Sequence, residues 1–159
     1  MEEEAELTRL HPDHVTVLRI SAIIGSAPFL IAGIVGEIVM LATGTLFPGI
    51  VLLPLLIVLG WIVFFLPWRR YSARGYVMGS DRLRVVKGIL FHKDTVVPFG
   101  RVQHIDVERG PIERAFGLAT LVLHTAGTHN ASVSLPGLAE QDAVDMREAI
   151  RAKIKQDMA

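Results

Sequence analysis

The chain has 159 residues, 16 basic and 16 acidic residues, and no cysteine. The lack of cysteine excludes disulfides, thiolate catalysis and cysteine-ligated metal sites, and the net charge of zero gives no indication of nucleic-acid binding. The charges are unevenly placed: residues 20–68 contain only Glu37, whereas residues 69–159 carry 14 of the 16 basic and 10 of the 16 acidic residues. This division predicts a membrane segment joined to a water-soluble module.

Two apolar stretches in the first half predict a transmembrane hairpin. Residues 20–42 and 47–68 are each long enough to cross about 30 Å of hydrocarbon as a helix. The connection at residues 43–46 is short and uncharged, so the two helices should be antiparallel neighbours. Pro28 and Pro54 lie inside these stretches and are expected to kink them.

The flanking charges predict the orientation of this hairpin. Cytoplasmic flanks of membrane helices are enriched in arginine and lysine, which places the segment 1–19 and the C-terminal half in the cytoplasm and the connection outside. The arginines concerned are Arg9 and Arg19 before the first span and Arg69, Arg70 and Arg74 after the second.

Glu37 is the one ionisable residue at membrane depth, and two interpretations are open. It could belong to a proton or ion path, or it could be a carboxyl near the outer end of the first span that reaches the interface or stays protonated. The second is favoured because the other span offers no polar partner. Ala32 and Gly36 form a weak small-xxx-small pattern that would let helices approach closely.

From residue 73 the pattern changes to short strand-like runs separated by turn residues. The alternation of Leu83 and Val85 with Arg82 and Arg84 is typical of a half-buried strand. The runs are residues 73–78, 82–87, 89–92, 94–98, 101–108, 118–125 and 131–135, with a turn at 126–130.

The last segment predicts a helix. Within residues 139–156, the apolar residues Ala143, Met146, Ile150 and Ile154 recur at helical spacing between charged residues. About seven strands followed by an amphipathic helix predict an α+β fold, in which a small, partly open β-barrel is capped by the C-terminal helix.

The order of several short motifs resembles the bacterial pleckstrin-homology (PH) domain, specifically its membrane-anchored, YdbS-like family. The match covers nearly the whole chain, including the lead-in at residues 10–12 and both spans. The motifs are residues 81–83 (DRL), 87–90 (KGIL), 97–103 (VPFGRVQ), 107–111 (VERGP), 114–119 (RAFGLA) and 124–127 (HTAG).

This resemblance implies a cytoplasmic PH-like domain at residues 71–159 on a two-helix anchor, in the inner membrane of a prokaryote. It implies no known reaction and no cofactor. Bacterial domains of this kind are regarded as interaction or assembly modules, so the expected partners are the lipid bilayer and either another membrane protein or a second copy of the chain.

Two groups of residues are candidates for binding, each with a plainer structural interpretation. Arg101, Gln103, Arg109 and Arg114 could form an edge that contacts a protein, or they could belong to turns and solvated surface. The basic residues could instead contact anionic lipid near the membrane, or they could be a topology signal plus a solvated strand face. These basic residues are Arg69, Arg70, Arg74, Arg82 and Arg84, with Lys87 beside them.

No catalytic or metal site is predicted. His104, His124 and His129 could approach one another, but the spacing matches no metal motif. Ser132 and Ser134 lie in a strand without the sharp turn that presents a nucleophile. The leading hypothesis is therefore a non-enzymatic interaction or assembly module, followed by a sensor of anionic lipid head groups and, third, a small transport subunit that uses Glu37.

Overall fold

The computed structural model describes residues 7–44, 47–89, 91–126 and 132–157, with side chains to residue 156. The chain divides into two compact units. One unit is Val15–Arg69, and the other combines Met1–His14 with Arg70–Ala159. We call them the helical unit and the soluble unit and describe each by itself.

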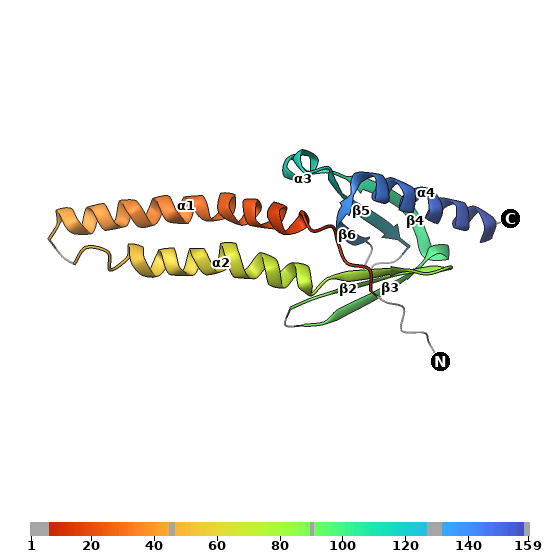
Figure 1. Cartoon of the computed structure of the whole chain (residues 1–159), viewed down its shortest axis with the longest axis horizontal. Coiled ribbons are helices and arrows are strands. Elements are labelled where there is room, and N and C mark those ends of the chain that lie inside the picture. Colours follow the sequence, from red (N-terminus) through yellow and green to blue (C-terminus); the bar gives the residue numbers. More distant parts are fainter. Residues whose placement is uncertain (1–6, 45–46, 90, 127–131, 158–159) are drawn as a thin grey trace. The chain divides into compact units, whose positions relative to one another are not determined.

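The helical unit consists of two helices, α1 (His14–Ala42) and α2 (Leu52–Ser72), drawn in orange and yellow-green in Figure 1. Helix α1 begins before residue 20 and helix α2 begins after residue 47, so both predicted starts differ from those in the structure. Pro54 therefore lies in the first turn of α2, where a proline costs no hydrogen bond, while Pro67 lies inside that helix. Residues 45–46 of the expected connection are outside the described residues.

Large apolar side chains cover the outside of both helices. Phe29 is 64% exposed, Ile57 is 72% exposed and Phe64 is 67% exposed. Both helices are long and apolar enough to cross a membrane. Helices that are apolar on all sides need a surrounding that is itself apolar, which agrees with the predicted membrane segment.

The close approach between the two helices is at Gly33. A Cβ atom there would lie 2.2 Å from a methyl carbon of Leu55, so a larger residue would require that side chain to move. At Gly36, which belongs to the weak small-xxx-small pattern, an added Cβ would meet nothing within 4 Å.

The soluble unit contains two antiparallel three-stranded sheets, with orders β1-β2-β3 and β4-β5-β6. The α+β fold with a C-terminal helix is confirmed, and within the described residues no strand of one sheet pairs with a strand of the other. The elements are β1 (Gly75–Met78), β2 (Arg82–Lys87), β3 (Lys93–Pro98), the short helix η1 (Phe99–Arg101), β4 (Val102–Glu108), α3 (Pro111–Ala115), β5 (Leu118–Thr125), β6 (Ser132–Ala139) and α4 (Glu140–Asp157).

The strand expected at residues 89–92 is wrong. Gly88 has φ +132°, and a Cβ there would collide with the carbonyl oxygen of Phe91. The chain reverses at this point, so that Lys87 pairs with Lys93 in a β2–β3 hairpin. The turn expected at 126–130 lies outside the described residues except for Ala126.

The predicted inward faces form the core of the soluble unit. Leu83 is fully buried, and Val85, Ile105, Val133 and Leu135 are at most 6% exposed. Burying each such side chain contributes about 1.5–3 kcal/mol. The alternation read from the sequence is therefore confirmed at these positions, while residue 131 is outside the described residues.

Helix α4 packs its apolar face on the sheets, as predicted. Ala143 and Ile150 are fully buried, and Met146 is 9% exposed. At the far end of the helix, Lys153 Nζ donates a hydrogen bond of 2.9 Å to the carbonyl oxygen of Gly79. This contact fixes the last turns of α4 against the β1–β2 turn.

The described residues before α1, residues 7–13, belong to the soluble unit. Thr8 and Tyr76 exchange two backbone hydrogen bonds of 2.9 and 3.0 Å, which extends the edge of β1. The His11 N–H donates to the carbonyl oxygen of Gly137 at 2.8 Å. The Tyr71 hydroxyl donates to the carbonyl oxygen of Leu10 at 3.0 Å, so both chain segments that flank the helical unit are tied to this fold.

Candidate functional site

A groove runs between strand β4 and helix α4 in the soluble unit. It has a volume of about 250 Å³. Residues 102–105 of β4 line one side, and Arg151, Ile154 and Lys155 of α4 line the other. Ile154 packs against the core and forms an apolar base, while Arg151 and Lys155 are exposed. The groove therefore combines an apolar floor with two positive charges, of which Arg151 also lies 3.5 Å from the carboxylate of Glu148.

Strand β4 is an edge strand. It pairs with β5 on one side, and no described strand pairs with its other side. An edge strand presents backbone N–H and C=O groups to which an extended segment can add. The pairing with β5 is irregular at Gln103, because Val102 faces Thr125 while His104 faces the adjacent His124. This bulge lies in the stretch of β4 that lines the groove.

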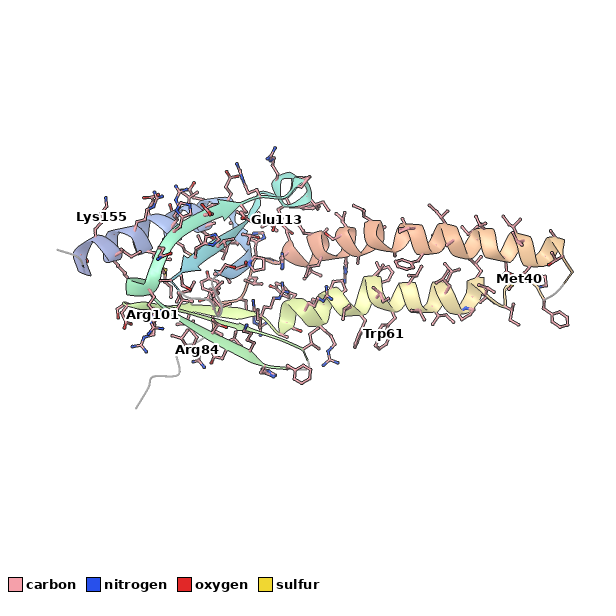
Figure 2. The ribbon with its side chains drawn as sticks, turned by 180° about the vertical axis from the view of Figure 1, so that it is seen from behind. Met40, Trp61, Arg84, Arg101, Glu113 and Lys155 are labelled. Carbon is pink, nitrogen blue, oxygen red and sulfur yellow. The ribbon has the colours of Figure 1, made fainter. Side chains whose placement is uncertain are left out.

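The structure separates the four residues predicted to form an interaction edge. Arg101 and Gln103 are exposed at the start of β4, while Arg109 forms an ion pair with Glu140 and Arg114 lies in α3. Gln103 and Arg109 are six residues apart along β4 and its end, which is about 20 Å at the rise of an extended strand. Figure 2 shows Arg101 and Lys155 at one end of the soluble unit and Glu113 of α3 at the other.

The predicted basic surface is largely neutralised in β2. Arg82 forms an ion pair with Asp81 at 3.0 Å, and Arg84 forms one with Asp94 at 2.6 Å. The hydrogen bonds from Arg82 lower the pKa of Asp81, and those from Arg84 lower the pKa of Asp94. Each of these arginines thus has an acidic neighbour that competes with any lipid anion.

The other three predicted basic residues differ from one another. The Arg69 guanidinium lies 5.6 Å from the centre of the Phe65 ring, and Arg70 is exposed. Arg74 is half-buried in the soluble unit, with Nη1 3.5 Å from Nε2 of His14. Burial lowers the pKa of Arg74, and the charge of Arg70 adds to this effect.

Two histidines share one carboxylate on the outer face of the β4–β5 sheet. His104 Nε2 lies 2.8 Å from Asp106, and His124 Nε2 lies 3.3 Å from the other oxygen of the same carboxylate. The third histidine of the metal hypothesis, His129, is outside the described residues. Within the described ranges, no group of three or more potential metal ligands is suitably arranged.

Glu37 accepts hydrogen bonds from the backbone at the start of α2. It is 8% exposed, and its carboxylate accepts from the N–H groups of Gly49, Val51 and Leu52, the last two at 3.2 Å each. The first N–H groups of a helix have no partner within the helix. The polar partner of Glu37 is therefore the backbone at the start of α2. It is not a polar side chain of the second span, which is why the sequence did not reveal it.

Sequence reasoning also missed the basic residues of the groove. In the sequence, Arg151 is one of the charged residues between the apolar positions of the C-terminal helix, and nothing singles out Lys155. Arg151 and Lys155 are four residues apart, so they lie on one face of the helix, with Ile154 beside them. This spacing was the signal available in the sequence. Which strand edge would lie next to that face could not be read from the sequence.

The family model described as "Bacterial PH domain" matches residues 22–154, which is 133 of the 159 residues. The chain is 32% identical over 88 residues to the UPF0699 transmembrane protein YdbS of Bacillus subtilis (strain 168), covering 55% of this chain. The match spans 54% of the length of that relative. No solved structure matches significantly. The match through both helices and both sheets shows that this chain is a membrane protein of the bacterial PH domain family, similar to YdbS.

Proposed function

We propose that this protein is a non-enzymatic interaction module, anchored in the membrane by its helical unit, whose β4–α4 groove binds an extended acidic segment of a partner protein. The observation that carries this proposal is the groove of about 250 Å³ beside an edge strand, with Arg151 and Lys155 on its rim. A partner chain would add to the edge of β4 through main-chain hydrogen bonds. The two cations would select acidic side chains.

The geometry supports one bound strand. The apolar contacts offered by Val102, Ile105 and Ile154 can accept alternate side chains of an extended segment. The side chains in between would face Arg151 and Lys155. A partner with alternating acidic and small or apolar residues satisfies both conditions, whereas a basic partner would be repelled.

A synthetic peptide tests this proposal on the full chain in detergent micelles. The probe is a fluorescent peptide of alternating glutamate and threonine, and the control peptide has lysine in place of glutamate. The acidic peptide should bind, and Arg151→Glu combined with Lys155→Glu should weaken that binding at least about tenfold, since two favourable charge contacts become repulsive. The matched control is Arg84→Glu, which changes a cation in the other sheet.

Two results would reject the proposal that the groove binds the acidic peptide. One is equal binding of the acidic and the basic peptide. The other is an equal loss of affinity in the groove variant and in Arg84→Glu, since that would reflect net charge alone. A photo-crosslinker at Gln103, compared with one at Val96 in β3, locates the bound peptide independently. Crosslinking that is no stronger from Gln103 than from Val96 would also count against the proposal.

We also propose that both flanks of the helical unit face the cytoplasm. The arginines at residues 9, 19, 69, 70 and 74 against an uncharged connection support this orientation. Because the chain has no cysteine, single introduced cysteines report it cleanly. In intact cells a membrane-impermeant maleimide should label Thr43→Cys and leave Gly100→Cys unlabelled until the cells are opened. Labelling of Gly100→Cys but not of Thr43→Cys in intact cells would show the opposite orientation.

A further inference from the structure

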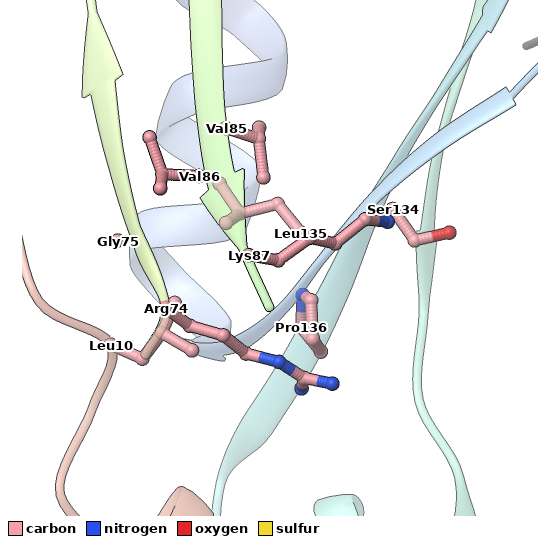
Figure 3. A pocket seen from close by; sticks show the side chains of 9 residues that line it. All are labelled: Leu10, Arg74, Gly75, Val85, Val86, Lys87, Ser134, Leu135 and Pro136. Atoms are coloured by element: carbon pink, nitrogen blue, oxygen red, sulfur yellow. The ribbon is translucent and has the colours of Figure 1, made fainter. Parts of the chain in front are cut away.

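A second cavity lies on the other side of the soluble unit, where strands β1 and β2 meet β6 (Figure 3). Its volume is about 140 Å³. Arg74 and Lys87 line it together with apolar side chains that include Val86, Leu135 and Pro136. Figure 3 shows the guanidinium of Arg74 beside Pro136. The lining has two cations and no carboxylate.

Neither cation of this cavity has an acidic partner. Among the described residues, no ion pair includes Arg74 or Lys87. Nη1 of Arg74 lies 3.5 Å from Nε2 of the His14 imidazole. A guanidinium can only donate, so Nε2 of His14 accepts and carries no proton. The neutral imidazole therefore does not neutralise the positive charge of Arg74.

The surroundings hold this arginine in position. His14 is 3% exposed, and it packs against Gly137, where an added Cβ would lie 2.5 Å from the ring carbon Cγ. Gly137 also has φ +73°, a conformation that other residues rarely adopt. The ring and the arginine that contacts it are thus fixed by backbone that tolerates little change. A half-buried cation without a counter-charge is costly, and an anion in the cavity would offset that cost.

We propose that this cavity binds a phosphate group through Arg74 and Lys87. A guanidinium binds two phosphate oxygens at once, and a lysine adds a point charge. The cavity of about 140 Å³ is several times the share of liquid volume that one water molecule takes, about 30 Å³, so a tetrahedral anion fits. The apolar lining favours a phosphate that carries an apolar substituent, as in a phospholipid.

The position of Arg74 in the chain gives such a lipid access. Arg74 follows Ser72, the last residue of α2, by two residues, which limits its backbone to within about 7 Å of the end of that helix. Helix α2 is one of the two candidate membrane spans. The head group of a phospholipid beside that helix end is therefore the nearest abundant source of phosphate. A free phosphate ester is the alternative source of the same chemistry.

The test uses the full chain in dodecyl maltoside and two ligands, short-chain phosphatidylglycerol and inorganic phosphate. Binding is measured by native mass spectrometry and by the shift in melting temperature. Wild type should bind phosphatidylglycerol, and Arg74→Gln should weaken this at least about tenfold through the loss of charge-assisted hydrogen bonds. Arg84→Gln is the matched control, because Arg84 lies in the same strand as Lys87 and is paired with Asp94.

The two ligands separate the sources. If only phosphatidylglycerol binds, and its binding depends on Arg74, the ligand is a membrane lipid. If inorganic phosphate binds equally well, the ligand is a soluble phosphate. Unchanged binding in Arg74→Gln, or the same loss in Arg84→Gln, overturns the proposal. If Arg74→Gln does not fold, the same measurement is made on Lys87→Gln. Unchanged affinity for phosphatidylglycerol in that variant also overturns the proposal. The outcome is independent of the peptide test, which uses residues of the other groove.

Discussion

The helical unit and the soluble unit treat their apolar side chains in opposite ways. Ile57 and Phe64 of the helical unit are 72% and 67% exposed, whereas Leu121 and Leu123 of the soluble unit are fully buried. In the soluble unit, the removal of apolar surface from water stabilises the fold. In the helical unit the lipid takes the place of a core, so the structure depends on satisfying backbone polar groups inside the helices and at their ends.

This difference also decides where binding can occur. The helical unit has one buried carboxylate, and the backbone of the neighbouring helix uses both of its oxygens. The soluble unit has exposed cations beside an edge strand and a second pair of cations in a cavity. We therefore propose that recognition of a charged partner belongs to the soluble unit, and that the helical unit serves to hold this unit at the membrane.

The largest expected effect comes from opening the core of the soluble unit. Leu121→Ala removes a fully buried side chain and should lower the free energy of unfolding by about 2–5 kcal/mol. Ile57→Ala, on the outside of α2, makes the matched comparison in the helical unit and should cost much less. Limited proteolysis of the full chain in micelles over a urea series measures both. Equal costs would break the contrast between the two units.

The next effect concerns the single carboxylate of the helical unit. Glu37→Ala removes the acceptor of three N–H groups at the start of α2, and charge-assisted hydrogen bonds contribute about 1.5–3 kcal/mol each. Glu37→Gln keeps one acceptor oxygen and should lose less. Hydrogen exchange at residues 49–52 should rise in both variants, more strongly in Glu37→Ala. Unchanged exchange would show that Glu37 does not stabilise the start of α2.

The smallest effect is on the surface of the soluble unit. Arg84 holds the pKa of Asp94 below its usual range, so the pair stabilises the fold above the ordinary carboxyl pKa. That contribution disappears as the pH falls through the lowered pKa. Because both side chains are exposed, Asp94→Asn should cost less than about 1 kcal/mol at pH 7. Urea midpoints at pH 7 and pH 3 measure it, and the variant should show the smaller pH dependence.

The sequence predicted those features that depend on local pattern. Leu118–Thr125 was predicted with the bounds that β5 has, because a continuous apolar run is typical of a buried strand. The inward positions Leu83 and Val85 followed from alternation. The strand at residues 89–92 was wrong because the φ of Gly88 reverses the chain, and a sequence shows a glycine without its backbone angle.

The features that join distant parts of the chain could not be read this way. The donors to Glu37 are backbone N–H groups, which nearly every residue has, so no side chain indicated them. The cavity beside Arg74 needs Lys87 and residues of β6 at the same place, and that depends on how the two sheets pack. The groove likewise needs α4 to lie beside the edge of β4. Arg82 and Arg84 looked equivalent to Arg74 in sequence, and the structure distinguishes them by their acidic neighbours and their greater exposure.

Binding of the acidic peptide to two variants, one in each unit, tests the central claim most directly. Arg151→Glu with Lys155→Glu changes the soluble unit, and Glu37→Gln changes the helical unit, both in the full chain in micelles. We predict that the first variant loses at least about tenfold in affinity and that the second binds like wild type. Wild-type affinity in the groove variant, or an equal loss in Glu37→Gln, would contradict the division of roles between the two units.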